Sequence, residues 1–213
     1  GAYKLPESYS INAKHLPDSI CVEAEKFVQT ILKTTGCKAR ITSKKKADIE
    51  MSLDTNLPNE GYKLSVTKKK IQISASTTSG FFYAFQTIKK IMPAHVMAGL
   101  NPEQAQAIIP TFQTDKRPTI PCVEIYDEPR FWYRGFMLDC GRHFFTVDEI
   151  KHILDGMAMY KMNYFHWHLT EDQGWRFEVK KYPRLTSIGS VASDCRMNDM
   201  EKGYYWLGKP YGP

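Results

Sequence analysis

Residues 133–169 carry the pattern that most constrains the fold of this chain. Two short, mostly apolar runs at 133–139 and 163–169 each suit a buried strand. Between them, Thr146 and Glu149 stand at the spacing of a capping box, in which each residue satisfies a backbone N–H of the other at the start of a helix. The apolar residues that follow recur at intervals of three and four, as on one face of a helix. The region therefore predicts a βαβ unit with two parallel strands.

A single βαβ unit is expected to be incomplete, because a parallel sheet needs cover on both faces. With only two strands, apolar strand faces and edge hydrogen-bonding groups would meet water. We therefore expect further βα units beyond Pro213 or from a partner. The composition of this half agrees with a large apolar structure, since 17 of the 27 aromatic residues and all four tryptophans lie from Phe131 onward.

Polar side chains lie at the ends of both predicted strands. Arg142 and His143 follow the first strand, and His168, Glu171 and Asp172 lie at or after the end of the second. In parallel α/β arrangements, functional residues collect where strands end and loops toward helices begin. An arginine there offers fixed, charged donors to neighbouring oxygens, such as vicinal sugar hydroxyls or a carboxylate. The pattern predicts a polar site at the mouth of an α/β barrel.

Each of these residues also has a structural interpretation. Arg142 could hold its loop through a salt bridge. His166 and His168 stand two apart on a strand and so face the same way, which allows a shared metal ion. We favour packed, hydrogen-bonded histidines, because no further ligands stand at convincing spacing. Trp167 and Trp175 offer flat apolar faces that suit either a pyranose or a protein core.

The first half of the chain predicts a separate α+β domain over residues 1–126. Asp18 is expected to cap a helix that ends at Gly36, and Ser79-Gly80 to open a second helix that Pro93 closes. The stretch Asp-Glu-Pro at 127–129 marks the crossing into the second domain, 127–213. Strands are predicted at 39–42, 48–53, 62–66, 71–75, 108–113 and 120–125, with 62–66 and 71–75 paired as a hairpin.

The excess positive charge of the chain lies in this first half. Residues 1–118 hold 17 Lys and Arg against 10 Asp and Glu, whereas residues 119–213 hold 12 against 13. Two runs, at 44–46 and 68–70, supply much of the excess. Nucleic-acid binding is one hypothesis for them, but no aromatic residue is interleaved to stack on bases. We therefore favour solvated turns and strand edges, and no nucleic-acid partner.

Other function classes are also disfavoured by composition. No run approaches 18 consecutive apolar residues, so no membrane span is expected, and the first residues lack the apolar stretch of a secretion signal. Five scattered cysteines without a Cys-x-x-Cys pair predict neither a disulfide framework nor a zinc site.

Three motifs in order resemble the opening of the catalytic barrel of family 20 glycoside hydrolases, the β-N-acetylhexosaminidases. They are Arg-Gly-Phe-Met-Leu-Asp-Cys-Gly-Arg-His-Phe-Phe (134–145), Met-Ala-Met-Tyr-Lys-Met-Asn-Tyr-Phe-His-Trp-His-Leu-Thr-Glu-Asp-Gln-Gly-Trp-Arg (157–176) and Lys-Tyr-Pro-Arg-Leu (181–185). The first half is similar, more weakly, to the α+β domain that precedes this barrel, most clearly at Ser-Gly-Phe-Phe-Tyr-Ala-Phe-Gln-Thr (79–87).

The resemblance implies an α+β N-terminal domain followed by the first βαβ part, strands 1 and 2, of a truncated (β/α)8 barrel. It implies an enzyme that releases terminal β-linked N-acetylglucosamine or N-acetylgalactosamine from glycans with retention. In this family the acetamido oxygen of the substrate is the nucleophile. An Asp polarises the acetamido group, and a Glu acts first as general acid and then as base. That pair belongs to the fourth strand, so the chain alone is expected to hold no catalytic residue and to be inactive.

A few roles carry over by position in the resemblance. Arg142 matches the arginine that grips the 3- and 4-hydroxyls of the terminal sugar. Glu171 matches a position, often Asp, that supports a histidine in contact with the catalytic acid, and His168 lies near the same pocket. Asp172 and Trp175 belong to the motif without an assigned role. The resemblance implies a glycan partner, no cofactor or metal, and a secreted, periplasmic or lysosomal location.

Two other classes of function stay open on the sequence. One is a noncatalytic carbohydrate-binding or accessory protein, which the absence of the acid pair from this chain favours. The other is a metal-dependent barrel hydrolase that uses His166 and His168. That chemistry usually places its His-x-His pair on the first barrel strand, whereas here the pair is predicted on the second.

Overall fold

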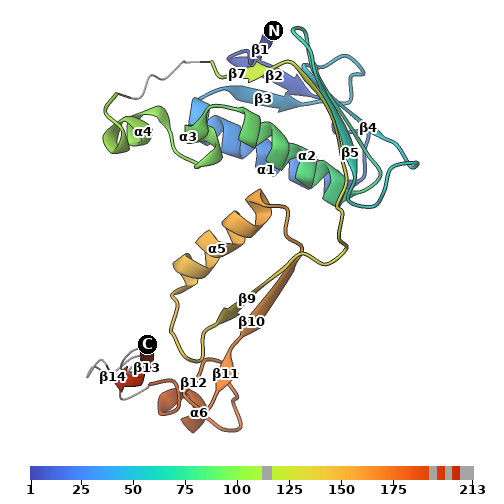
Figure 1. The fold of residues 1–213 in the computed structure, drawn as a ribbon. Helices are drawn as coiled ribbons and strands as arrows, with labels where there is room; N and C mark the ends of the chain where they lie inside the picture. Colours follow the sequence, from blue (N-terminus) through green and yellow to red (C-terminus); the bar gives the residue numbers. More distant parts are fainter. Residues whose placement is uncertain (112–116, 192–195, 200–202, 207–213) are drawn as a thin grey trace. The chain divides into compact units, whose positions relative to one another are not determined.

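The chain folds into two units, seen in a computed structural model that describes residues 1–111, 117–191, 196–199 and 203–206 (Figure 1). Unit 1 comprises Gly1–Trp132, and unit 2 comprises Tyr133–Pro213. Each unit has its own cluster of buried apolar residues, a large one in unit 1 and a small one in unit 2.

Unit 1 is built on a six-stranded mixed sheet in the order β3-β2-β4-β6-β5-β8. The pairs from β3 to β6 are parallel, and β5 is antiparallel to both β6 and β8. Two further strands, β1 (Ala2–Lys4) and β7 (Thr119–Pro121), form a separate antiparallel pair. The strands of the large sheet are β2 (Ser8–Ile11), β3 (Lys38–Ile41), β4 (Ile49–Leu53), β5 (Tyr62–Val66), β6 (Ile71–Ala75) and β8 (Val123–Asp127).

Two long helices lie beside the sheet and enclose the core of unit 1 (Figure 1). The rings of Phe27 and Phe85, one from each helix, stack with their centroids 4.5 Å apart. Alternate residues of β5 and β6 are buried in the same core, as expected for a half-buried hairpin. A search of the helices in the described ranges finds no candidate membrane span. The helices of unit 1 are α1 (Asp18–Thr35), α2 (Thr78–Ile91), α3 (Ala94–Met97) and α4 (Pro102–Ile108).

Most predicted elements of unit 1 are confirmed, with small shifts at their ends. The hairpin at 62–66 and 71–75 has the predicted bounds and is antiparallel. Gly36 ends the first helix with a φ of 76°, a left-handed conformation that suits glycine, and its N–H donates to Leu32 O. The N-cap is Pro17, not Asp18, which is instead the first helical residue. For the second helix the N-cap is Thr77, whose hydroxyl accepts from Gly80 N.

In unit 1, one strand prediction was wrong, one was confirmed in part, and the strands β1 and β2 were not predicted. The strand expected at 108–113 is absent over 108–111, where Ile108 is the last residue of α4; residues 112 and 113 lie outside the described part. Asn101 and Gln104 form a capping box with a proline at the first turn, which favours a helix there. The single strand expected at 120–125 is divided between β7 and β8, which belong to different sheets. The strands β1 and β2 are only three and four residues long, so their alternation of exposed and buried residues is too short to identify a strand from the sequence.

Unit 2 opens with the predicted βαβ unit. The elements are β9 (Gly135–Asp139), α5 (Val147–Met159) and β10 (Tyr164–His168), and the two strands pair in parallel. The capping box of Thr146 and Glu149 is present at the start of α5. The unit also contains α6 (Arg184–Ser187), the antiparallel pair β11 (Thr170–Glu171) and β12 (Gly174–Trp175), and the antiparallel pair β13 (Arg196–Asp199) and β14 (Gly203–Trp206).

The strands of this βαβ unit expose large apolar side chains. Met137 is 51% exposed and Trp167 47% exposed, whereas the buried cluster beside them contains only Leu138, Cys140 and Ile150, with partly buried neighbours. Exposed strand faces were the expected consequence of a parallel pair without further strands. Nothing in unit 2 within the described ranges covers them.

Substitution of Gly80 tests the packing of α2 against the sheet. A Cβ atom at Gly80 would lie 2.6 Å from Gly61 O and 2.8 Å from Ala75 Cβ. We expect Gly80→Ala to destabilise unit 1 by about 1–3 kcal/mol, because backbone must move to make room. Urea unfolding followed by far-UV circular dichroism measures the change. Ser79→Ala, at the exposed neighbouring position, should change stability by less than about 0.5 kcal/mol. Equal effects of the two substitutions would contradict the close approach.

Candidate functional site

The predicted site residues meet at the carboxyl ends of β9 and β10. The two strands pair in register, so that Asp139, the last residue of β9, lies opposite His168, the last residue of β10. The ladder continues one step further, where Cys140 N donates to His168 O at 2.9 Å. Both strands therefore end at the same edge of the sheet, and the loops that follow them are neighbours.

Asp139 shapes the loop that follows β9. Its Oδ1 accepts hydrogen bonds from the backbone N–H groups of Gly141 and Arg142, each at 3.0 Å. Its Oδ2 accepts from Nη1 of the Arg142 guanidinium at 2.9 Å. The carboxylate of Asp139 thus stabilises the turn at residues 139–142 and also binds the Arg142 side chain.

Glu171 approaches the same guanidinium from the other strand end. It lies on β11, which pairs with β12 just after β10, and its Oε2 is 2.9 Å from Nη2 of Arg142. Its Oε1 accepts from the backbone N–H of Asp172 at 3.0 Å. The two terminal nitrogens of Arg142 therefore each face a different carboxylate, and the side chain remains 49% exposed.

His168 lies beside this ion-pair group without a hydrogen bond on its buried ring nitrogen. Its Nε2 is 3.4 Å from Glu171 Oε2, a contact that satisfies the distance of an ion pair but not the geometry of a hydrogen bond. The ring of His166 is stacked on the same side, with centroids 6.3 Å apart. The prediction that these two histidines face the same way is confirmed. Among the described residues, however, no group of three His, Cys, Asp or Glu residues could hold a metal ion.

Two glycines allow the two loops to approach this closely. A Cβ atom on Gly141 would lie 2.6 Å from Glu171 Cβ, and one on Gly174 would collide with Gly141 O. The guanidinium of Arg176 adds a further link, because its Nε donates to Cys140 O at 2.9 Å. The backbone of one loop therefore lies directly against the other loop at Gly141 and Gly174. This close approach brings Glu171 to Arg142.

The ionisation of the group follows from these contacts. The hydrogen bond to Asp139 raises the pKa of Arg142, and the charges of Glu171 and Asp172 act in the same direction. The backbone hydrogen bond from Asp172 lowers the pKa of Glu171, with further lowering from the charges of Arg142 and His168. Burial raises the pKa of Asp139, but the hydrogen bonds from Arg142 outweigh it and the net shift is downward. All three groups are charged at neutral pH.

The structure brings together the three residues that the sequence singled out, Arg142, Glu171 and His168. Asp139 was recognised only as a strand end, although its spacing of three residues before an arginine was the available evidence. Trp175 lies on β12, and its indole N–H donates to Phe177 O. Asp172 contributes its backbone to Glu171 and its charge to Arg142.

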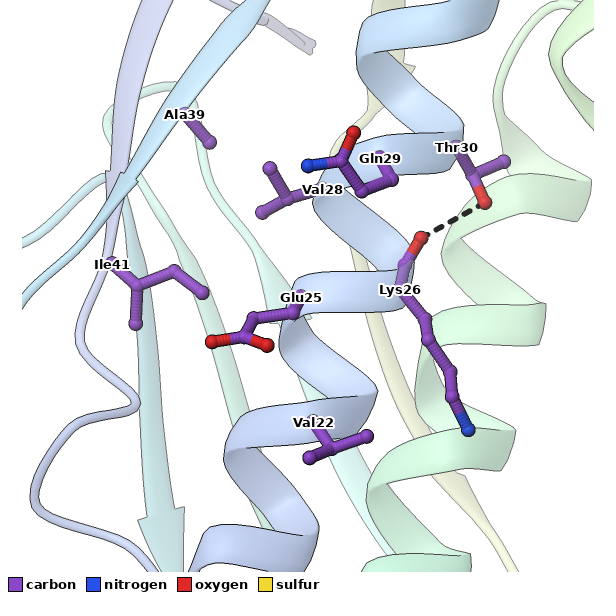
Figure 2. Close-up of a pocket in the computed structure, with 8 residues that line it drawn as sticks. All are labelled: Val22, Glu25, Lys26, Val28, Gln29, Thr30, Ala39 and Ile41. Atoms are coloured by element: carbon purple, nitrogen blue, oxygen red, sulfur yellow. Dashed lines mark hydrogen bonds between the residues drawn. The ribbon is translucent and has the colours of Figure 1, made fainter.

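Unit 1 carries an open groove between α1 and the edge strand β3 (Figure 2). It has a volume of about 680 Å³. Its only carboxylate is Glu25, and Lys26 is paired with Glu23 at 2.7 Å. A lining with one acid offers no acid–base pair for glycoside chemistry. The groove is lined by Val22, Glu25, Lys26, Val28, Gln29, Thr30, Ala39 and Ile41.

Comparison with known protein families assigns both units to the same family. The family model described as glycosyl hydrolase family 20, domain 2, matches residues 1–128, which is more than half of the chain. The chain belongs to glycosyl hydrolase family 20. The model of the family 20 catalytic domain matches residues 131–207 and so contains the strand ends described above.

Individual relatives of this family 20 chain are named as hexosaminidases. A beta-hexosaminidase of Porphyromonas gingivalis is 40% identical over 88% of this chain, which covers 24% of the relative. An exo beta-N-acetylglucosaminidase of Vibrio harveyi, solved in complex with N-acetylglucosamine, has a TM-score of 0.76 at 28% identity over 100% of this chain and 30% of its own. A beta-N-acetylhexosaminidase of Bacteroides fragilis has a TM-score of 0.68 at 33% identity over 88% of this chain and 34% of its own. The chain thus spans about a quarter to a third of these relatives.

The titration of Asp139 tests the electrostatics of the site. Its pKa should lie below the ordinary value of about 3.9 and should rise in Arg142→Ala, because the side-chain hydrogen bond and the charge of Arg142 are lost while the backbone hydrogen bond from residue 142 remains. Carbon-detected NMR of the carboxyl groups in the 213-residue chain measures both values. A lowered folded pKa also means that Asp139 stabilises unit 2 above the unfolded value and that this contribution is lost as the pH falls through the folded value.

The matched control for this titration is Lys151→Ala. Lys151 pairs with Asp148 at the same three-residue spacing on α5, at 3.3 Å. Its loss should leave the pKa of Asp139 unchanged. A pKa of Asp139 that responds equally to both substitutions, or to neither, would contradict the assigned contacts.

Proposed function

We propose that this chain is part of a retaining exo-β-N-acetylhexosaminidase, which removes terminal β-linked N-acetylglucosamine or N-acetylgalactosamine from glycans. The observation that carries the proposal is the half-exposed Arg142 guanidinium, held between two carboxylates at the shared carboxyl edge of β9 and β10 in a family 20 chain. A guanidinium held in this way offers fixed donors to vicinal hydroxyls. The names of the relatives support the same activity.

The proposal places β9 and β10 as the first two strands of a (β/α)8 barrel. The exposed apolar side chains of Met137 and Trp167 support this, because further strands and helices would bury them. Functional residues of such barrels lie at the carboxyl ends of the strands, which is where Arg142 and Glu171 lie. The boundary between this barrel and the preceding α+β domain is proposed at residues 126 and 127.

Within this mechanism, Arg142 binds the 3- and 4-hydroxyls of the terminal sugar and fixes the orientation of its ring. The acetamido oxygen of the substrate attacks the anomeric carbon, and an Asp–Glu pair supplies polarisation and acid–base catalysis. We place that pair in the part of the longer relatives that this chain does not span. We also propose, from the family, a secreted, periplasmic or lysosomal location for the protein.

Glu171 and His168 support the site from the second strand. We assign Glu171 to orienting a histidine that contacts the general acid, in addition to its contact with Arg142. Its Oε2 faces Arg142 at 2.9 Å and His168 at 3.4 Å, so one oxygen lies between the proposed sugar-binding cation and a buried ring nitrogen, Nε2, that makes no hydrogen bond. The side chain of Glu is one methylene longer than that of Asp, which allows it to reach across to Arg142.

Hydrolysis assays on the longer protein encoded by the same gene test the proposal. It should hydrolyse the nitrophenyl β-glycoside of N-acetylglucosamine and should not hydrolyse nitrophenyl β-glucoside, which lacks the acetamido nucleophile. The 213-residue chain should hydrolyse neither, because we place the acid–base pair in the part of the relatives that this chain does not span. Equal hydrolysis of both substrates would rule out substrate assistance. An inactive longer protein that still binds N-acetylglucosamine in calorimetry would favour the alternative, a noncatalytic carbohydrate-binding or accessory protein.

A further inference from the structure

Among the described residues, the side chain of Asp139 makes no hydrogen bond or ion pair outside its own turn. Its Oδ1 accepts from the backbone of Gly141 and Arg142, and its Oδ2 accepts from the Arg142 guanidinium. Glu171, by contrast, divides its oxygens among Arg142, His168 and the backbone of Asp172. Of the two carboxylates, Asp139 is therefore the one whose side-chain partner is Arg142 alone.

Among the described residues, the side chains that restrain the guanidinium of Arg142 are those of Asp139 and Glu171. The side chain is 49% exposed, and a long, exposed arginine loses rotamer freedom when it binds a ligand. The Asp139 contact at Nη1 and the Glu171 contact at Nη2 fix the plane of the group before any ligand arrives. The Nε–H and a second N–H on each terminal nitrogen have no acceptor among the described residues and remain available to donate.

We propose that Asp139 is a positioning residue, which holds the guanidinium of Arg142 in the orientation that recognises the hydroxyls of the terminal sugar. The proposal rests on the proposed function, because it assumes that Arg142 contacts the sugar. It predicts that Asp139 contributes to the preference for substrates with those hydroxyls, although Asp139 itself does not touch the substrate. Preorganised donors distinguish a hydroxyl from its absence more strongly than mobile donors do.

The two oxygens of Asp139 allow its two tasks to be separated. In Asp139→Asn, the amide oxygen can still accept from the backbone N–H groups of residues 141 and 142. The amide nitrogen would then face Nη1 of Arg142, so that a donor meets a donor and the attraction between charges is lost. The turn is retained while the guanidinium is released.

The experiment compares two substrates in the longer protein, nitrophenyl N-acetyl-β-glucosaminide and its 4-deoxy analogue. Wild-type protein should prefer the hydroxylated substrate in kcat/KM, and Arg142→Ala should abolish most of this preference. Asp139→Asn should reduce the preference by about tenfold, with little loss on the 4-deoxy substrate. In an Arg142→Ala background, Asp139→Asn should cause no further change in the preference.

Asp148→Asn is the matched control. Asp148 also pairs with a cation three residues away, at 3.3 Å, but it lies on α5 and its side chain is 84% exposed. Its substitution should leave both substrates and their ratio unchanged. If Asp139→Asn does not fold, Asp139→Ser keeps an oxygen for the backbone of the turn and carries the same expectation.

The outcomes of this experiment distinguish failure of the positioning role of Asp139 from failure of the proposed hexosaminidase activity. Equal loss on both substrates in Asp139→Asn, with the preference intact, would overturn the positioning role and leave Asp139 as a structural residue of the turn. A preference that persists in Arg142→Ala would remove Arg142 from hydroxyl recognition, and the positioning role with it, while hydrolysis of the acetamido substrate would still stand. Absence of hydrolysis by wild-type protein would overturn both.

Discussion

The parallel, in-register pairing of β9 with β10 is the constraint on which the candidate site depends. Because Asp139 lies opposite His168, the two strands end at the same level and both following loops begin at one edge. A shift of one residue would turn every side chain of one strand to the other face. The pairing thus decides that Arg142 and Glu171, which are 29 positions apart in the printed sequence, can share an ion pair at 2.9 Å.

The chemistry of the site depends on the balance between the positive charge of Arg142 and its two neighbouring carboxylates, as well as on their short distances. A guanidinium between two carboxylates is less suited to capturing an anion than a lone arginine is, because its charge is already offset by Asp139 and Glu171. Its remaining N–H groups are still good donors to neutral hydroxyls. This balance agrees with the neutral terminal sugar proposed as ligand. The hydrogen bond to Asp139 raises the pKa of Arg142, whereas the pKa of Glu171 is lowered first by the backbone hydrogen bond from Asp172 and then by the charge of Arg142.

The sequence predicted the elements with strong local patterns and missed those that depend on distant partners. The hairpin at 62–66 and 71–75 and the capping box of Thr146 are local, and both were found where expected. The short strand β2 has no such pattern, because it is defined by its parallel partners β3 and β4. The helix α4 was not predicted, since its capping box at Asn101 was overlooked, and its last residue, Ile108, was assigned to the start of a strand.

In the candidate site, too, residues within local motifs were predicted and roles that depend on tertiary contacts were not. The motifs predicted Arg142, Glu171 and His168, and the structure brings all three together. The spacing of Asp139 three residues before Arg142 was not sufficient to predict its role, because an aspartate at a strand end has many uses and only the folded structure shows which group each oxygen contacts. The requirement for Gly141 was equally hidden, since it arises from the approach of the second loop.

A crystal structure of the longer protein with N-acetylglucosamine bound would test the central claim most directly. Arg142 should donate to hydroxyls of the sugar while Asp139 stays at Nη1 and Glu171 at Nη2, in the contacts described above. A sugar bound with the Arg142 side chain turned away from it, or with Asp139 released from the guanidinium, would contradict the account.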